Sequence, residues 1–214
     1  MNVIKKVFIP THASTRSRFH DAKGNRVDMA GLWYAPAAVL GNLLKIYFNY
    51  RPPAPWFSYR ACRTLNRLIR KDWRVLEFGS GMSTLWLARR CGTLHSIEDD
   101  PQWYEVVRRL VGTGIRYELR TAAAYADLSE YPDGFFDLVL VDGLARDQCV
   151  RSSVPKVKPG GYLYLDNSDL QDEALRRAEG CVLDAVKQRH GQVRYFTDFA
   201  PTLASVTQGL LARL

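Results

Sequence analysis

The chain has 214 residues, of which 47% are hydrophobic and 24% charged, and its formal net charge is +8. This composition fits one globular domain with an extension and excludes a low-complexity chain or a repeat protein. The 4 cysteines, Cys62, Cys91, Cys149 and Cys181, form no C-x-x-C pair, so we expect reduced thiols in a cytoplasmic protein rather than a zinc site or a secreted disulfide framework.

The positive charge is concentrated near the amino terminus. Residues 1–70 carry 12 Lys and Arg against 2 acidic residues, whereas residues 71–214 carry 18 against 20. Such an arm can bind RNA, anionic lipid or a phosphorylated substrate, or it can be a solvated helix face, because Arg60, Arg63, Arg67 and Arg70 recur at helical spacing. Residues 1–10 lack a sustained apolar region and a small-residue cleavage pattern, so we predict no targeting peptide.

Residues 31–50 are apolar enough to raise the question of a membrane span. Pro36, Asn42 and Lys45 argue against one, and we predict no transmembrane segment but leave association with a membrane surface open. The residues Val39, Leu43, Ile46 and Tyr47 fall on one helix face, as expected for a helix that packs on the core or caps a substrate cleft. A proline-rich linker, residues 51–55, follows. We therefore predict an extension over residues 1–55 and a domain over residues 56–214.

The domain begins with a helix over residues 56–69, and a short apolar strand then ends in a glycine turn. Residues 74–81 read R-V-L-E-F-G-S-G, with Gly79 and Gly81 placed to let a ligand approach the backbone N–H groups. A dinucleotide fingerprint would need a third glycine where this chain has Thr84, which disfavours a nicotinamide or flavin cofactor. We expect the next helix, residues 83–90, to begin on hydroxyl N-cap residues.

The glycine turn resembles motif I of class I S-adenosylmethionine-dependent methyltransferases, which has the form E-x-G-x-G. This resemblance implies that S-adenosylmethionine is the cofactor and that the turn and the start of the next helix hold it: Glu77, Gly79, Ser80, Gly81, Ser83 and Thr84. A second strand, residues 93–97, delivers Glu98, and a carboxylate there can accept hydrogen bonds from two ribose hydroxyls. Asp100 and Pro101 then form the N-cap and first turn of another helix.

The remaining chain continues the alternation of strands and helices. We predict strands at residues 115–119 and 136–141. Residues 154–164 then predict a helix end, a glycine turn and a further strand that ends at Leu165, Asp166 and Asn167. A final pair of strands follows at residues 192–196 and 204–211, joined by residues 197–201. The order predicts an α/β, Rossmann-like, doubly wound sheet of about seven strands. The methyltransferase resemblance, which covers residues 55–214, implies that the last strand is antiparallel.

Three oxygen-bearing side chains follow the fourth and fifth strands, at Asp142, Asp166 and Asn167. Metal-dependent catechol-type O-methyltransferases hold a divalent ion with such residues, so the resemblance implies Mg²⁺ or another hard ion here. Those families also place a lysine three residues after the first acid, but this chain has Ala145 there, followed by Arg146. Because arginine stays protonated, Arg146 is a candidate for orienting an anionic substrate rather than for accepting a proton.

Two other readings of these residues remain. Asp166 and Asn167 can form a strand-end turn without a ligand, and Asp142 can be a metal-free base or a cofactor contact. His95 lies within a strand, where a packed histidine is the simpler interpretation.

The sequence predicts an O-methyltransferase that acts on a small molecule or sugar, with Asp142, Asp166 and Arg146 as its catalytic candidates. One alternative is an RNA methyltransferase or RNA-binding module that uses the basic arm. Residues 142–145 read D-G-L-A, whereas DNA and RNA amino-methyltransferases carry N/D-P-P-Y/F at this place. This difference argues against a nucleobase as the methyl acceptor. The other alternative is a non-catalytic protein that binds a membrane surface or a partner.

Overall fold

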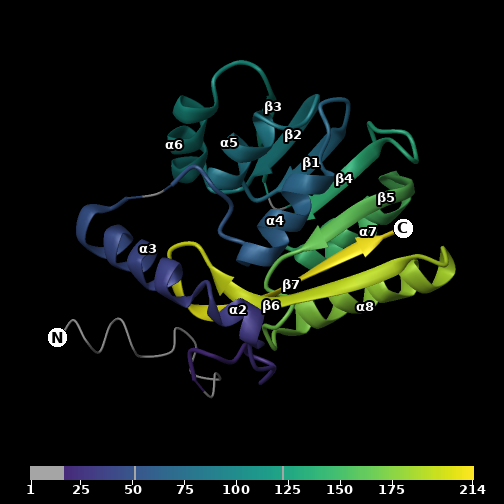
Figure 1. Cartoon of the computed structure of the whole chain (residues 1–214). Helices are drawn as coiled ribbons and strands as arrows, with labels where there is room; N and C mark the ends of the chain where they lie inside the picture. Colours follow the sequence, from purple (N-terminus) through teal and green to yellow (C-terminus); the bar gives the residue numbers. More distant parts are fainter. Residues whose placement is uncertain (1–16, 51, 122) are drawn as a thin grey trace.

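A single mixed β-sheet organises the domain (Figure 1). The computed structural model describes residues 17–50, 52–121 and 123–214; residues 1–10, where we predicted no targeting peptide, lie outside this part. The strands are β1 (Arg74–Phe78), β2 (Thr93–Glu98), β3 (Arg116–Leu119), β4 (Phe136–Val141), β5 (Val157–Leu165), β6 (Gln192–Ala200) and β7 (Leu203–Arg213), in the order β3-β2-β1-β4-β5-β7-β6. β7 pairs antiparallel with both of its neighbours, β5 and β6, and the other pairings of this sheet are parallel. The predicted fold is confirmed.

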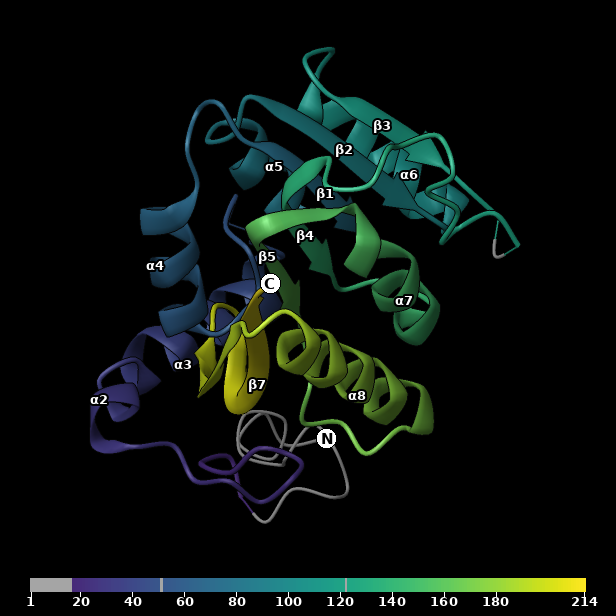
Figure 2. The same cartoon turned by 90° about the vertical axis from the view of Figure 1, so that its right-hand side faces the viewer.

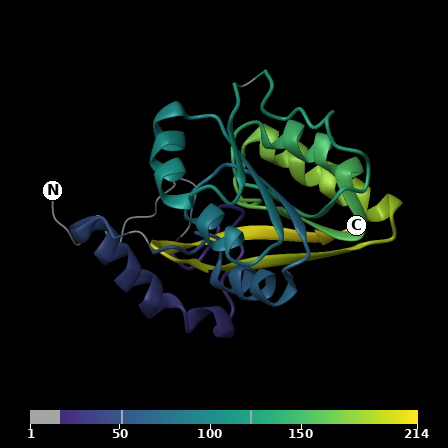
Figure 3. The same cartoon turned by 90° about the horizontal axis from the view of Figure 1, so that it is seen from above.

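Helices cover both faces of this sheet (Figures 2 and 3). They are α2 (Met29–Leu32), α3 (Ala35–Phe48), α4 (Tyr59–Leu68), α5 (Met82–Ala88), α6 (Pro101–Val111), α7 (Arg146–Lys156) and α8 (Glu173–Gln188). In Figure 2, α2, α3 and α4 lie on the left, and α7 and α8 lie across the sheet on the right. The two layers agree with the predicted alternation of strands and helices.

The central strand β1 divides its side chains between two apolar cores. Leu76 and Phe78 pack in the core under α7 and α8, whereas Val75 packs with Leu65 of α4 and Leu87 of α5. Neighbouring residues of a strand point to opposite faces, so these side chains enter different cores. Both cores are covered by helices, and both sets of side chains are buried. This explains why the strand reads as a continuous apolar run.

The parallel strands bring their carboxyl ends to one edge of the sheet. The backbone N–H of Asp142 donates to the carbonyl of Phe78 at 2.9 Å, and that of Asp166 donates to the carbonyl of Val141 at 3.1 Å. The residues that follow β1, β4 and β5 therefore meet at this edge, as Rossmann-like folds require of a ligand site.

The final hairpin is longer than expected. We predicted that residues 197–201 connect the last two strands, but β6 runs to Ala200 and the turn occupies Pro201 and Thr202, where Thr202 takes a positive φ of 65°. Asp198 and Phe199 still pair with β7, and both are buried under the amino-terminal helices. The polar residues and the proline of this stretch suggested a loop. The strand continues instead because a distant segment of the chain buries it, which the local sequence does not show.

The amino-terminal helices pack on this hairpin. Val27 and Ala38 form a small apolar cluster with Phe199 and Val206, and α3 lies against β7. The predicted packing face of this segment was partly wrong, because Ile46 and Tyr47 are exposed to solvent. No helix in the described ranges is both long and apolar enough to cross a bilayer.

Candidate functional site

The turn after β1 is a tight backbone crossing with β4. Gly79 has a φ of +85°, and a Cβ atom there would lie 2.7 Å from the Cα of Gly143. A side chain at this position would therefore be unfavourable for two reasons. The backbone has a positive φ, and the Cβ atom would clash with a neighbouring main chain. Gly81 differs, since a Cβ there would meet only Trp103, at 3.9 Å. It is Gly81, not the expected hydroxyl residue, that occupies the N-cap of α5.

Glu77 is a buried acid directly before this turn. Its Oε2 accepts hydrogen bonds from the hydroxyls of Thr84, at 2.6 Å, and Ser96, at 2.7 Å. Its Oε1 has no partner among the described residues. Burial raises the pKa of Glu77 to about 7, against the opposing effect of its hydroxyl neighbours.

The first turn of α5 is held through the same acid. Thr84 accepts from the backbone N–H of Gly81 at 2.9 Å while it donates to Glu77, and Ser83 is buried beside it. Both hydroxyl bonds of Thr84 are therefore used within the turn itself, whereas the buried Oε1 of Glu77 has no partner among the described residues.

Glu98, at the end of β2, already accepts four hydrogen bonds. Its Oε2 receives the backbone N–H of Ser80 at 2.9 Å and the hydroxyl of Ser80 at 2.5 Å. Its Oε1 receives the backbone N–H groups of Asp99 and Asp100, both at 3.0 Å. The acid therefore ties the glycine turn to the end of the neighbouring strand.

Only the Ser80 hydroxyl in this set is free to rotate. A ribose hydroxyl could take its place on Oε2, since the other three donors are fixed backbone groups. Ser80 would then keep its second contact, to the hydroxyl of Tyr117 at 2.7 Å.

Two aromatic residues that we did not predict complete this side of the site. The indole N–H of Trp103 donates to the carbonyl of Ser80 at 2.8 Å, and Tyr117 stacks on Tyr104 with ring centroids 4.5 Å apart. The N-cap at Asp100 placed Trp103 in the first turn of α6, which was the available signal. Tyr117 needed the β2–β3 register, which pairs it with Ser96 and which the sequence does not reveal.

A second polar cluster follows β4 and β5, centred on the guanidinium of Arg146. Its Nη2 donates to Oδ1 of Asp142 at 2.9 Å, and its Nη1 donates to the carbonyl of Asp166 at 2.7 Å. Both terminal nitrogens also donate to Oδ1 of Asn167, at 3.1 and 3.2 Å. The predicted candidates Asp142, Arg146 and Asn167 are therefore in direct contact.

The two acids of this cluster have raised pKa values. Partial burial at the end of β4 raises the pKa of Asp142, and the Arg146 charge opposes the shift. Burial and the nearby Asp142 raise the pKa of Asp166 well above its usual range. The carboxyl of Asp166 accepts from the hydroxyl of Tyr164 at 2.9 Å, so it is turned toward the core.

These residues do not fit the divalent ion that we expected. Arg146 donates to both Asp142 and Asn167, so a guanidinium stands between two of the three proposed ligands. A metal ion would have to displace this cation or lie against its charge. Within the described residues, no group of three or more His, Cys, Asp or Glu side chains could hold a metal.

His95, by contrast, behaves as the sequence indicated. It is buried, its Nδ1 lies 2.7 Å from the hydroxyl of Tyr131, and burial lowers its pKa to about 4. It is a neutral packed histidine.

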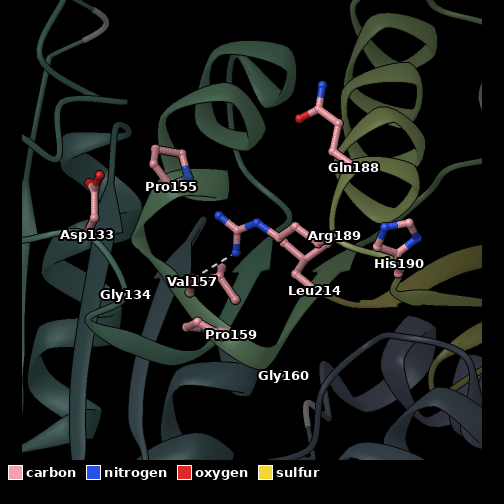
Figure 4. Close-up of a pocket in the computed structure, with 10 residues that line it drawn as sticks. All are labelled: Asp133, Gly134, Pro155, Val157, Pro159, Gly160, Gln188, Arg189, His190 and Leu214. Carbon is pink, nitrogen blue, oxygen red and sulfur yellow. Dashed lines mark hydrogen bonds between the residues drawn. The ribbon is translucent and has the colours of Figure 1, made fainter.

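A surface hollow lies away from both polar clusters. A cavity of about 740 Å³ opens at the opposite edge of the sheet, where β5 begins and α8 ends (Figure 4). Arg189 lines this cavity, and its guanidinium donates to the carbonyls of Val157, at 3.0 Å, and Val154, at 2.8 Å. This cation is therefore already hydrogen-bonded within the protein. None of the predicted site residues lines it.

Comparisons with known proteins agree with this geometry. Residues 76–168, which contain the glycine turn, Glu98 and the Arg146 cluster, match the family model described as a methyltransferase domain. These residues form a class I S-adenosylmethionine-dependent methyltransferase domain, whose activity is methyl transfer from that cofactor. No curated protein is significantly similar to the chain in sequence.

Several solved structures share the fold. The O-methyltransferase TomG from Streptomyces achromogenes, involved in tomaymycin synthesis and solved with S-adenosylmethionine, has a TM-score of 0.59 and 18% identity over 87% of this chain and 96% of its own. An O-methyltransferase from Bacillus cereus, solved with S-adenosylhomocysteine, has a TM-score of 0.59 and 16% identity over 86% and 96%. Cofactor-bound Rv0187 from MTB has a TM-score of 0.56 and 21% identity over 87% and 90%.

Proposed function

We propose that this protein transfers a methyl group from S-adenosylmethionine to a hydroxyl of a small molecule or sugar, without help from a divalent metal. Two of the structures with the same fold are described as O-methyltransferases, which supports the hydroxyl as acceptor. S-adenosylmethionine supplies an electrophilic methyl group on a sulfonium. The remaining chemistry consists of holding the reactants in line and removing one proton.

The proposal depends on Asp142 as the group that accepts the proton. Arg146 holds its Oδ1, and no group in the described part of the chain donates a hydrogen bond to its Oδ2. Its side chain is one-third exposed at the cofactor edge of the sheet, and its raised pKa makes the carboxylate a better proton acceptor than a free aspartate.

In the proposed step, the acceptor oxygen forms a bond to the methyl carbon while the carbon–sulfur bond breaks, and the electron pair of that bond stays on sulfur. The proton of the acceptor hydroxyl passes to Asp142. Arg146 stays protonated and fixes the orientation of Asp142.

We assign cofactor binding to the residues around the glycine turn. Glu77 offers its unpaired Oε1 to a cationic amino group, and Glu98 offers Oε2 to the ribose. Gly79 and Gly81 keep the backbone open beside them. The amino-terminal extension, proposed to end near residue 55, would shape the acceptor pocket through α3, which packs next to this edge on β7.

An acceptor screen with isotopically labelled S-adenosylmethionine tests the proposal. We expect transfer to a hydroxyl compound by the wild-type protein. Asp142→Asn should lower kcat on the order of 100-fold while the protein still binds S-adenosylhomocysteine. Asp133→Asn, at an exposed acid near the opposite edge of the sheet, is the matched control. Transfer only to RNA, or full activity of Asp142→Asn, would contradict the proposal.

A further inference from the structure

The amino-terminal helices expose an unusual number of apolar side chains. Of the 15 large apolar side chains that are exposed in the described residues, 7 come from the short stretch between residues 29 and 50: Met29, Trp33, Leu40, Ile46, Tyr47, Phe48 and Tyr50. Solvent contact of this extent is unfavourable unless another surface covers it. The core therefore does not explain why this segment is apolar.

Part of this set forms a stripe along one side of α2 and α3. Trp33, Leu40 and Tyr47 are 85%, 58% and 54% exposed, and their spacing of seven residues keeps them on one side of a helical segment. Met29, 77% exposed, lies one turn before Trp33. The opposite side packs on the hairpin, with Ala38 fully buried and Gly41 close to Thr202.

A groove rich in arginine adjoins this stripe. It is a hollow of about 570 Å³ next to Trp33 and Tyr34. Four arginines are among the residues that line it: Arg60, Arg63 and Arg67 of α4, and Arg194 of β6. Arg60 is neutralised by Asp28 and Asp198. In the described residues, no ion pair includes Arg63, Arg67 or Arg194, so these three cations face the groove without carboxylate partners.

The charge around this face has one sign. From residue 29 to residue 71 the sequence contains 7 Lys and Arg and no Asp or Glu. The helices α2, α3 and α4 lie on the same side of the molecule in both Figure 2 and Figure 3. An exposed apolar stripe next to unpaired cations is the pattern of a surface that lies on an anionic bilayer.

We propose that this face, formed by Met29, Trp33, Leu40, Tyr47 and the arginines 63, 67 and 194, docks the protein on an anionic lipid membrane. The apolar stripe enters the interfacial region, and the arginines contact lipid phosphates. A second copy of the chain fits less well, because a two-fold contact would place cations against cations. RNA would use the arginines and Trp33 but leaves the aliphatic residues Met29 and Leu40 without a role.

Cosedimentation of the full chain with lipid vesicles tests this inference. We expect binding to vesicles of phosphatidylglycerol and phosphatidylcholine, and far weaker binding to phosphatidylcholine alone. The double variant Arg67→Ala and Arg194→Ala should lower partition to the anionic vesicles about 30-fold. Trp33→Ser should lower it on the order of tenfold.

Matched controls separate this face from general charge and hydrophobicity. Arg109→Ala with Arg151→Ala removes the same charge from α6 and α7, and Leu110→Ser removes an exposed apolar side chain from α6. Both should partition as the wild type does. The circular dichroism spectrum of each variant confirms that it is folded.

Three results would overturn the inference. They are equal loss of binding in the control variants, arginine-dependent binding to single-stranded RNA without binding to vesicles, and a dimer that dissociates on Trp33→Ser while vesicles are not bound. Methyl transfer in solution is a separate measurement, so failure of vesicle binding and failure of the proposed function are distinguishable.

Discussion

Individual acids at the strand ends have distinct tasks, and Glu98 is the most constrained of them. It accepts three backbone N–H groups and one hydroxyl, which fixes its carboxylate at the end of β2. Replacing it changes both the turn and the proposed ribose contact.

We predict that Glu98→Gln weakens binding of S-adenosylhomocysteine at least tenfold. The amide keeps one acceptor oxygen and loses the charge, and a charge-assisted hydrogen bond contributes about 1.5–3 kcal/mol. Isothermal titration calorimetry measures the affinity. Glu105→Gln, on the exposed side of α6, should bind like the wild type. Unchanged affinity in Glu98→Gln would remove Glu98 from the cofactor site.

Glu77 should make stability depend on pH. Its folded pKa is about 7 against an ordinary value of 4.5, so between these values the folded protein keeps a proton that the unfolded chain has released. Stability from this residue is present below pH 4.5 and is lost as the pH rises to about 7, by roughly 3 kcal/mol. Urea unfolding at pH 5 and pH 7.5 should show a smaller loss for Glu77→Gln than for wild type. Equal losses would mean that Glu77 does not titrate in this window.

The Arg146 cluster predicts that methyl transfer persists in EDTA. The guanidinium already neutralises Asp142 and donates to the amide oxygen of Asn167, so removal of divalent ions should change the rate less than twofold. Rates are compared with EDTA, with added Mg²⁺ and with neither. Activity that is lost in EDTA and restored by Mg²⁺ would show that Arg146 moves aside for a metal.

At the scale of elements, the close crossing between the turn after β1 and the turn after β4 is the feature most sensitive to a single methyl group. Gly79→Ala should destabilise the fold by at least about 2 kcal/mol, because its Cβ meets the Gly143 backbone at a positive φ. Chemical denaturation measures the change. Gly180→Ala, within α8 and with no atom near its Cβ, should be neutral or stabilising. A neutral Gly79→Ala would mean that the two turns can separate.

A buried polar network joins the amino-terminal segment to the domain. Asp169 accepts from the backbone N–H groups of Ala22, at 2.9 Å, and Gln208, at 3.1 Å. Nearby, Asp21 accepts from the side chain of Gln208 at 3.2 Å. The sequence indicated a role for Asp166 at the end of β5, whereas Asp169, three residues later, makes this connection.

We predict that Asp169→Ala lowers stability by about 3 kcal/mol, since it leaves two buried N–H groups without an acceptor. Protease digestion should then cut first near residues 17–28. Asp172→Ala, an N-cap at the exposed start of α8, should cost only about 1 kcal/mol and leave that segment protected. Equal protection in both variants would assign the attachment to the apolar cluster instead.

At the scale of the whole molecule, the sheet was predictable because its strands are continuous apolar runs separated by helix signals. The glycine turn and Glu98 were predictable as a pair, since parallel strands end at one edge. The extension of β6 was not, because Phe199 is buried by residues of a distant segment. The hydrogen bonds from Arg146 to Asp142 and Asn167 were also missed, since spacing alone does not show which partner a guanidinium takes. The boundary near residue 55 stays a prediction.

The most direct measurement of the central claim is a crystal structure of the protein with S-adenosylhomocysteine. We predict the nucleoside at the carboxyl ends of β1, β2 and β4, with its ribose against Glu98 and its amino group near Glu77. A ligand bound instead in the hollow beside Arg189, or a site that stays empty at saturating concentration, would contradict the assignment.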